Sequence, residues 1–432
     1  MKAKILIVGG GVLGNSIALA TARRLDPLEE PVVLLERTVL ASGSSGRSGG
    51  LVRQQYADPM IAAMARDSIR EYTSFETRTG RSVGFQRAGV LTLAGPSRPE
   101  SLEKLTTNVE LQRSIGIDAQ VLDAAAIRER VPGIVVDDRA IAAWEPGGGF
   151  VDPNRTVAEF AALARSYGAA TRLGVEVTDL QIEGGRLVGA RTTEGDYQVE
   201  QLVLVAGAWS RRFLARFGIA LPIEVARIQQ LFVSLPGEKL EADPRLSETS
   251  GWSNVDLEDP LEREQERLLG KEEPLAVVAH PVIIDLEYGF YTRCEPEYRR
   301  TRVSPIAQSR DLLRPEPDEN DGPKPELARQ LFALLAKRLP VYEAEQQLES
   351  LVSWFPTTRD GRAIVGEMPG VRGLFVATGF ADHGFKLAPA VGQGVSQMLL
   401  GEPVSAFDPA YFAPDRFGSG VQDAGWNGDI YL

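Results

Sequence analysis

The stretch KILIVGGGVLG, residues 4–14, joins a short apolar run to three glycines in the spacing G-x-G-x-x-G. Residues 4–8 predict a β-strand, and residues 15–24 predict the helix that follows the glycines. A second apolar run at 32–35 predicts another strand, which ends at Glu36, 22 residues after the last glycine. Strand, glycine turn, helix, strand and acid in this order are typical of a dinucleotide-binding βαβ unit.

Each part of this unit has a physical role in holding a nucleotide. Gly9, Gly11 and Gly14 allow a tight turn, close approach of a pyrophosphate and close packing of the helix on the strand. The helix N-terminus offers free N–H groups and a positive dipole to phosphates. The Glu36 carboxylate accepts hydrogen bonds from a ribose diol and disfavours a 2′-phosphate, so we expect NAD or FAD rather than NADP.

Length and composition limit the class of protein. A chain of 432 residues exceeds what one hydrophobic core usually absorbs, so two domains are expected. The net charge of −12 argues against a nucleic-acid partner, which would require clustered basic surface. A single cysteine, Cys294, and two histidines argue against disulfides and metal sites, so the cytoplasm is the expected compartment. No long apolar run predicts a transmembrane segment, and the glycines near the N-terminus argue against a secretory signal.

Three further regions extend the nucleotide site and help to separate FAD from NAD. GSSGRSGGLVRQQY, residues 43–56, has flexible backbone and many N–H donors, which suits a loop around a pyrophosphate. A mobile surface loop is the alternative interpretation of its composition. Residues 174–210 alternate β runs with turns, and residues 373–380 contain another apolar run. We expect both regions to return to the nucleotide-binding sheet.

Several motifs spread over the chain form one pattern. They are GGGVLG with Glu36, SGRSGGLVRQQY at 45–56, GFVDPNR at 149–155, LVLVAGAWS at 202–210, TTRDGRAIVG at 357–366 and TGFADHGFKLAPAVG at 378–392. Together they resemble the FAD-dependent amine and amino-acid oxidoreductases, the family of D-amino acid oxidase, glycine oxidase and sarcosine oxidase. The match is loose between about 230 and 350.

The resemblance implies an α/β fold in which a Rossmann-like FAD-binding domain is interleaved with a substrate domain of α+β type, built on an antiparallel sheet. The FAD-binding domain is expected at 1–80, 150–225 and 350–432, and the substrate domain at 81–149 and 226–349. Strand-like runs compatible with the antiparallel sheet lie at 86–94, 227–235 and 276–293.

The resemblance also implies a substrate site at the start of the last helix. Residues 374–378 predict a strand and residues 386–400 a helix, so the loop between them directs a helix N-terminus toward the flavin. By resemblance to sarcosine oxidase, Arg53 and Lys386 hold the substrate carboxylate, with an ordinary surface pair as the alternative. His383 completes the expected catalytic set, either as a flavin or substrate contact or as a hydrogen-bonded structural histidine.

The residues expected to contact FAD come from the regions described above, and Lys386 is expected to serve both flavin and substrate. The predicted cofactor-binding set is Gly9, Gly11, Gly14, Glu36, Arg37, Ser44, Ser45, Arg47, Ser48, Gly49, Gly50, Val177, Ala206, Gly207, Trp209, Gly379, Asp382, Gly384, Phe385 and Lys386.

The chain also departs from the pattern of the family at identifiable positions. Sarcosine oxidase attaches its flavin to a cysteine where this chain has Ser353, so FAD is expected to bind non-covalently and Cys294 to be a packing residue. Glycine oxidase and D-amino acid oxidase hold the carboxylate with an arginine where this chain has Phe355, which favours the sarcosine oxidase arrangement. Arg293 is a further candidate for the substrate pocket.

The expected reaction oxidises the C–N bond of an amino acid or N-substituted amino acid, with a hydride passing to flavin N5 and water hydrolysing the imine. The lysine that promotes oxygen reaction in sarcosine oxidase falls near 299–302, which reads RRTR. An oxidase that uses O2 and a dehydrogenase with another electron acceptor therefore both stay open. Aromatic residues expected to line the apolar part of the site, or else the core, are Tyr56, Tyr291, Trp354 and Phe355.

Two other functions also stay open. One is a dehydrogenase subunit of a hetero-oligomer, with the acidic segments 240–267 and 314–326 either as partner surfaces or as solvated loops. The other is a FAD-containing assembly factor without turnover, against which the presence of both Arg53 and Lys386 argues.

Overall fold

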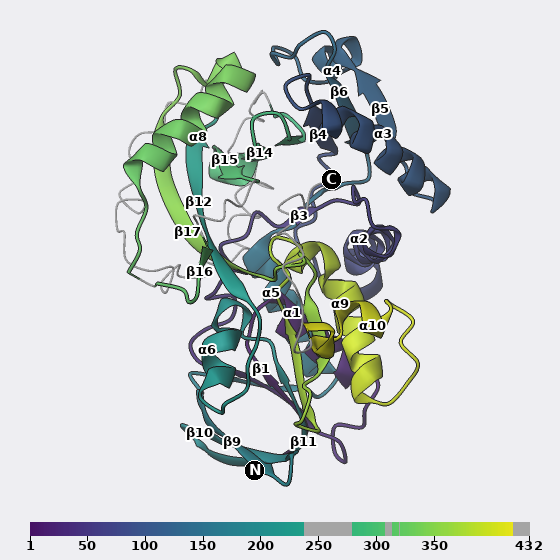
Figure 1. The fold of residues 1–432 in the computed structure, drawn as a ribbon, viewed down its shortest axis with the longest axis vertical. Helices are drawn as coiled ribbons and strands as arrows, with labels where there is room; N and C mark the ends of the chain where they lie inside the picture. Colours follow the sequence, from purple (N-terminus) through teal and green to yellow (C-terminus); the bar gives the residue numbers. More distant parts are fainter. Residues whose placement is uncertain (237–278, 307–312, 319, 418–432) are drawn as a thin grey trace.

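The computed structural model describes residues 1–236, 279–306, 313–318 and 320–417, which form two large sheets with helices packed around them (Figure 1). The sheet that carries the N-terminal strand lies in the lower half of Figure 1, and the second sheet lies in the upper half. Segment 240–267, a candidate partner surface, lies outside the described residues. No helix in the described part of the chain has the length and apolar character needed to span a bilayer.

The first sheet is built on the predicted βαβ unit. Its central strand β1 (Lys2–Val8) is parallel to β2 (Val32–Glu36) and to β11 (Gly195–Leu204), and β11 is parallel to β19 (Leu374–Thr378). The returns of the chain to this sheet at 174–210 and 373–380 are thereby confirmed. The outer strands are β8 (Ala170–Leu173), β9 (Val177–Glu183), β10 (Arg186–Thr192) and β18 (Ile364–Glu367).

Helices cover this sheet and bring distant parts of the sequence together. Helix α1 (Val12–Ala22) begins earlier than the predicted residue 15, because the extended backbone of Gly11 leads directly into it. It packs against α9 (Gly384–Leu399) so closely that a Cβ on Gly392 would lie 2.7 Å from the Ser16 carbonyl oxygen. The other helices of this region are α2 (Pro59–Thr79), α5 (Pro153–Ser166), α6 (Ser210–Ala215) and α10 (Pro409–Phe412).

The second sheet has the strand order β16-β12-β15-β14-β13-β4-β6-β5, and β17 pairs with β12. Its strands are β4 (Val90–Ala94), β5 (Gln120–Asp123), β6 (Ile141–Glu145), β12 (Glu224–Ser234), β13 (Val282–Asp285), β14 (Phe290–Glu295), β15 (Arg300–Pro305), β16 (Leu313–Arg314) and β17 (Gln347–Thr357). The described helices beside it are α3 (Pro99–Ser114), α4 (Ala124–Arg130) and α8 (Pro325–Arg338).

The pairing in the second sheet differs from a purely antiparallel arrangement at one place. Strands β4 and β13 are parallel, whereas the other pairs of this sheet are antiparallel. These two strands are far apart in the sequence, so no hairpin constrains their relative direction. Strand β17 joins this sheet although residues 350–357 fall in the segment predicted to bind FAD. The exact domain boundaries stay a prediction.

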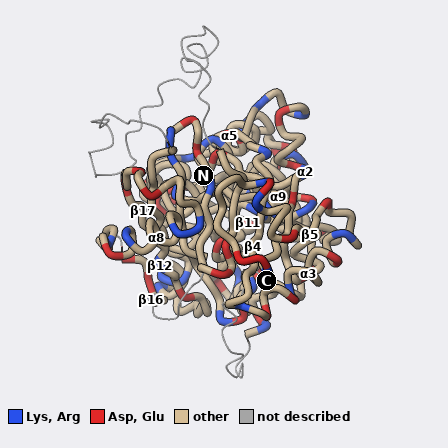
Figure 2. The backbone as a smooth tube through the Cα atoms, turned by 90° about the horizontal axis from the view of Figure 1, so that it is seen from above, with Lys and Arg blue, Asp and Glu red and all other residues tan. Residues whose placement is uncertain are grey.

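A short ribbon connects the two large sheets. Strand β3 (Leu51–Val52) pairs antiparallel with β7 (Gly149–Phe150), and the chain continues from β3 to Arg53 (Figure 1). One apolar core extends from the helices of the first sheet to this ribbon and to Val90, Val282 and Tyr291 of the second. Figure 2 shows basic and acidic residues interspersed along the described backbone.

Candidate active site

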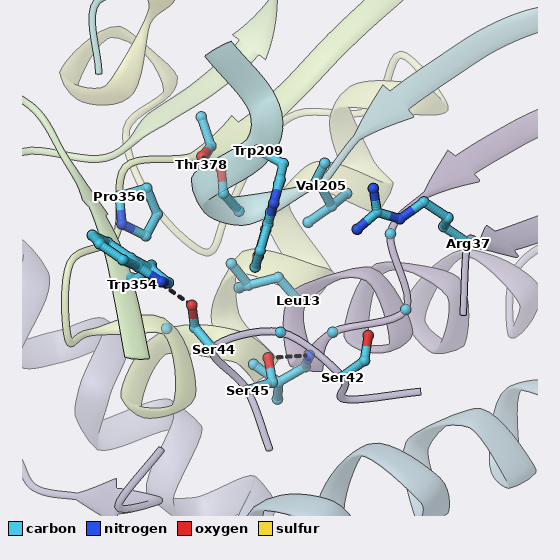
Figure 3. A pocket seen from close by; sticks show the side chains of 18 of the residues that line it. Leu13, Arg37, Ser42, Ser44, Ser45, Val205, Trp209, Trp354, Pro356 and Thr378 are labelled. Atoms are coloured by element: carbon cyan, nitrogen blue, oxygen red, sulfur yellow. Dashed lines mark hydrogen bonds between the residues drawn. The ribbon is translucent and has the colours of Figure 1, made fainter. Parts of the chain in front are cut away.

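A cavity with a volume of about 580 Å³ lies at the carboxyl ends of the parallel strands of the first sheet. Its wall comes from the glycine turn after β1, the end of β2, the loop at 42–48, the turn after β11 and the start of α9. Figure 3 shows Arg37, Ser45 and Trp209 around this space, contributed by separate segments of the chain. Parallel sheets commonly bind ligands at this edge.

The glycines of the turn are required by close backbone contacts. Gly9 has φ of +126°, and a Cβ there would lie 2.4 Å from the Val205 carbonyl oxygen. A Cβ on Gly14 would lie only 2.0 Å from the Gly9 carbonyl oxygen. Side chains at these positions would therefore push α1 away from β1. The turn holds its shape because glycine occupies both places.

Polar contacts hold the second strand and the serine loop against this turn. The Gly10 N–H donates to Glu36 Oε2 over 2.8 Å, and the Thr38 N–H donates to Glu36 Oε1 over 2.9 Å. At the N-terminus of α1, the Val12 N–H donates to Ser45 Oγ over 3.0 Å. The serine loop therefore lies against the N-terminus of α1.

The structure brings most of the predicted cofactor residues to the cavity wall. The predicted residues that line it are Gly9, Gly11, Glu36, Arg37, Ser44, Ser45, Arg47, Ser48, Val177, Ala206, Gly207, Trp209, Asp382, Gly384 and Phe385. The other members of the set, Gly14, Gly49, Gly50, Gly379 and Lys386, are not part of this wall. Several of these lie behind it: Gly14 contacts Gly9, and Gly49 contacts Tyr291.

Sequence reasoning missed several residues of the wall. Leu13 lies inside the glycine motif itself, so reading the whole turn would have included it. Arg212, Phe213 and Arg216 follow AGAWS at helical spacing, which was a usable signal. Asp318 and Asp321 also line the cavity, and no local pattern pointed to them. Of the four predicted aromatic liners, Trp354 and Phe355 belong to the wall, whereas Tyr56 and Tyr291 are buried beyond it.

Two buried cations lie beside the start of α9. Lys386 is 2% exposed, and its Nζ donates to Asp382 Oδ2 over 2.7 Å and to the Asp382 carbonyl oxygen over 2.8 Å. Arg53 is 1% exposed, donates to the Gln55 carbonyl oxygen and stacks 4.4 Å from the centre of the Tyr56 ring. Burial excludes the interpretation of Arg53 and Lys386 as an ordinary surface pair.

The charges of this group influence one another. Burial lowers the pKa of Lys386 to about 8, against the raising effect of Asp382, and Arg53 lowers it further. Burial would raise the pKa of Asp382, but Lys386, His383 and Arg53 together hold that carboxyl well below its usual range. Two cations therefore share one ionised carboxylate.

His383 lies in the same group and is neutral near pH 7. Burial lowers its pKa to about 4, although Asp382 opposes the change. Its Nδ1 atom is 3.1 Å from the Tyr56 hydroxyl and 3.4 Å from Asp382 Oδ1. These contacts correspond to a hydrogen-bonded structural histidine, one of its two predicted roles, and leave a flavin or substrate contact as a prediction.

Glu145, which the sequence did not single out, approaches the same group from β6. It is buried, and its Oε2 accepts the Gln54 N–H over 2.7 Å. Burial raises the pKa of Glu145, while the Gln54 N–H and Arg53 lower it. The structure thus adds a buried acid next to Arg53, from a segment with no recognisable motif.

Arg293 and Cys294 lie on opposite faces of β14. Arg293 contacts Phe150 and Glu295, toward the ribbon that leads to Arg53. Cys294 Sγ accepts from Thr301 Oγ1 over 3.5 Å and lies 3.8 Å from the Tyr342 hydroxyl. Burial would raise the pKa of Cys294, but His280 lowers it to about 6. The position matching the flavin-linked cysteine, Ser353, is buried on β17.

A comparison with protein-family models decides the family. The model described as FAD dependent oxidoreductase matches residues 4–398. The chain belongs to this family. The family's cofactor is FAD, and the resemblance inferred from the motifs is confirmed.

Several curated proteins are similar to this FAD dependent oxidoreductase. Glycine oxidase of Geobacillus kaustophilus is 27% identical, over 95% of this chain and 96% of its own. Human peroxisomal sarcosine oxidase is 24% identical, over 96% of each chain. 4-Methylaminobutanoate oxidase of Paenarthrobacter nicotinovorans is 27% identical over 97% of this chain but only 46% of its own. The chain thus spans less than half the length of some relatives that it matches.

Solved structures show the same fold. L-Proline dehydrogenase from P. horikoshii has a TM-score of 0.78 at 23% identity, covering 96% of this chain and 98% of its own. Glycine oxidase from Geobacillus kaustophilus has a TM-score of 0.74 at 24% identity, covering 96% and 99% respectively. The predicted fold class, a nucleotide-binding α/β part combined with a second sheet, is confirmed.

Proposed function

We propose that this FAD dependent oxidoreductase oxidises the C–N bond of an amino acid or an N-substituted amino acid. The observation that carries the proposal is the buried pair of cations, Arg53 and Lys386, beside the carboxylate of Asp382. A substrate carboxylate would be attracted by these two buried cations. The activities for which relatives are named, such as glycine oxidase and sarcosine oxidase, support the same class of substrate.

The cavity beside this group fits FAD. The N-terminus of α1 has no side-chain cap from Gly11, so its N–H groups suit a pyrophosphate at the glycine turn. Glu36 Oε1 accepts both the N–H and the hydroxyl of Thr38, whereas Oε2 accepts the Gly10 N–H and keeps further acceptor capacity for a ribose diol. Binding is proposed to be non-covalent, because Ser353 stands at the attachment position and Cys294 is engaged by Thr301.

We also propose how the chain is divided between the FAD-binding domain and the substrate domain. Segments 1–80, 150–225 and 350–432 are proposed to hold FAD, apart from strand β17, which pairs in the second sheet. Segments 81–149 and 226–349 are proposed to form the substrate domain.

The protein contributes binding and orientation to the reaction. Arg53 and Lys386 hold the substrate carboxylate, so the bond between the α-carbon and its hydrogen is presented in a constant orientation. When bound, FAD supplies the two-electron acceptor for a hydride from that carbon. The substrate nitrogen must be neutral, because its lone pair forms the C=N bond as the hydride leaves. Neutral His383 adds no positive charge near that nitrogen. Water then hydrolyses the imine to a carbonyl compound and an amine or ammonia.

The electron acceptor and the place of action belong to the same proposal. O2 and a separate acceptor are both compatible with it, and no lysine stands at 299–302, where sarcosine oxidase is expected to have one. If the acceptor is not O2, a partner subunit would supply it. We place the reaction in a reducing cytoplasm, since the chain has a single cysteine.

The experiment is an anaerobic titration of the purified protein, followed through the visible flavin spectrum. The panel comprises glycine, N-methylglycine, proline, and D- and L-amino acids, and each compound is paired with its carboxamide. We expect one or more carboxylates to bleach the flavin bands, and the matched carboxamides to fail. Air is then readmitted, because rapid return of colour indicates an oxidase and slow return a dehydrogenase. Bound flavin that no amine reduces would contradict the proposal and favour a non-catalytic or partner-dependent role.

A further inference from the structure

A cluster of buried arginines lies on the second sheet, where β14 and β15 pair. Its members are Arg293, Arg300 and Arg302, and Glu295 lies at the centre. The Glu295 carboxylate accepts from Arg302 over 2.7 Å, from Arg293 over 2.7 Å and from Arg300 over 2.8 Å. Burial would raise the pKa of Glu295, but Arg302, Arg293 and Arg300 hold it well below its usual range. Three cations thus converge on one ionised carboxylate.

Two of the three arginines have further partners. Arg300 Nη1 donates to Glu349 Oε1 over 2.6 Å. Arg302 Nη1 donates to Gln230 Oε1 over 2.6 Å and to the Arg47 carbonyl oxygen over 3.2 Å. The guanidinium groups of Arg300 and Arg302 each donate to several acceptors, as expected for structural ion pairs.

Arg293 differs from its neighbours. Its side chain is buried, with the residue 4% exposed, and its Nε and Nη1 atoms have no hydrogen-bond partner among the described residues. Its bond to Glu295 uses only Nη2. Burial lowers the pKa of Arg293, Glu295 opposes the change and Arg302 lowers the pKa further. Buried polar groups normally find partners, so a missing anionic partner is indicated.

The geometry directs Arg293 toward the ribbon that precedes Arg53. Alternate residues of a strand lie on the same face, so Arg293 shares its face with Tyr291. A Cβ on Gly49 would lie 2.4 Å from the Tyr291 hydroxyl oxygen, so this face meets the loop that enters β3. The Arg293 guanidinium lies 4.1 Å from the centre of the Phe150 ring, and Phe150 is paired with Leu51.

The ribbon also gives the backbone distance between the Phe150 pair and Arg53. Arg53 follows Leu51 by two residues, and each residue of extended chain spans about 3.3 Å. The backbone distance from the Phe150 pair to Arg53 is therefore roughly 7 Å. A short aliphatic chain with a carboxylate at each end has a comparable length.

We propose that Arg293 binds a second anionic group of the substrate, and that the preferred substrates are amino acids with two carboxylates. The second carboxylate is carried on the nitrogen substituent or on the side chain. This inference rests on the proposed function, in which Arg53 and Lys386 hold the first carboxylate. Arg293 is then a specificity-determining residue, and its Nε and Nη1 atoms, which have no partner among the described residues, can each donate a charge-assisted hydrogen bond to a carboxylate.

The test compares ligands that differ by one carboxylate. Propionate and succinate serve as unreactive probes, and their dissociation constants are measured from changes in the visible flavin spectrum. N-methylglycine and iminodiacetate serve as the matching amines in anaerobic flavin reduction. The variants are Arg293→Met, Arg293→Lys and Arg300→Met, the last of which removes a guanidinium from the same cluster.

We expect the wild type to bind succinate on the order of 10- to 100-fold more tightly than propionate, as for loss of a charge-assisted hydrogen bond. Arg293→Met should abolish this ratio while leaving propionate affinity unchanged, and Arg293→Lys should restore part of it. Arg300→Met should keep the ratio, which distinguishes substrate recognition from a general effect on the cluster. If Arg293→Met fails to fold, the ratio of succinate to propionate affinity in the wild type and in Arg293→Lys still tests the proposal.

Two results would overturn the inference. One is equal affinity of the wild type for succinate and propionate, and the other is a preference that survives in Arg293→Met. Failure of the proposed function gives a different pattern, in which neither amine reduces the flavin while the two probes still report on binding. Reduction by N-methylglycine with no advantage for iminodiacetate would retain the proposed function and remove the second anion site.

Discussion

Replacing Lys386 by methionine tests whether its ammonium group holds the substrate carboxylate. Methionine keeps much of the length of the side chain but removes the charge. A charge-assisted hydrogen bond contributes about 1.5–3 kcal/mol, so propionate should bind roughly 10- to 150-fold more weakly to the variant. The assay is a titration followed through the visible flavin spectrum, which also reports whether the variant retains FAD.

The pH dependence of propionate affinity gives a second quantitative test of Lys386. Burial lowers the pKa of Lys386 to about 8, and the charged form is the one that binds an anion. Wild-type affinity should be constant well below this pKa and fall as the pH rises through it, by about tenfold between about pH 7 and pH 9. His383, whose pKa burial lowers to about 4, stays neutral over this range, and propionate stays ionised.

A matched control separates this local effect from net charge. Lys2→Met removes the same charge at an exposed position of β1 and should leave both affinity and its pH dependence unchanged. A pH dependence that persists in Lys386→Met would arise from other groups, such as Glu145, whose pKa burial raises. Equal affinity of wild type and Lys386→Met at pH 7, with the same slope above it, would refute the assigned role.

Three further tests address the cofactor cavity, the arginine cluster and the mode of flavin attachment. Gly14→Ala places a Cβ 2.0 Å from the Gly9 carbonyl oxygen, so bound flavin should be lost, whereas Gly147→Ala meets nothing within 4 Å and should retain it, as measured by absorbance. Glu295→Gln leaves buried arginines without their carboxylate and should lower the free energy of unfolding by about 3–5 kcal/mol in a urea titration; an unchanged midpoint would contradict this. Cys294→Ser should bind FAD as the wild type does, and acid precipitation should release the flavin from both; flavin retained in the wild-type pellet alone would indicate a covalent bond.

The part of the site that local sequence predicts is the nucleotide-binding turn. The glycines and the apolar strand before them lie within a few residues of one another, so their geometry follows from backbone freedom and local packing. Glu36, 22 residues after Gly14, reaches the same turn from the adjacent parallel strand and accepts the Gly10 N–H. The family resemblance added Arg53 and Lys386, and the structure buries both beside Asp382. The starting residue of α1, the parallel pair in the second sheet and the place of β17 differed from expectation, and five predicted cofactor residues are not part of the cavity wall.

By itself, the sequence determined the βαβ unit, the returns of later strands to its sheet and the cations beside α9. Tertiary structure alone decided that Glu145 approaches Arg53, that Asp318 reaches the cofactor cavity and that Arg293 retains two N–H groups without a partner among the described residues. These contacts join segments far apart in the chain, and they depend on the register of strand pairing. A shift of one residue turns each side chain to the opposite face, so no local pattern can specify which distant groups meet.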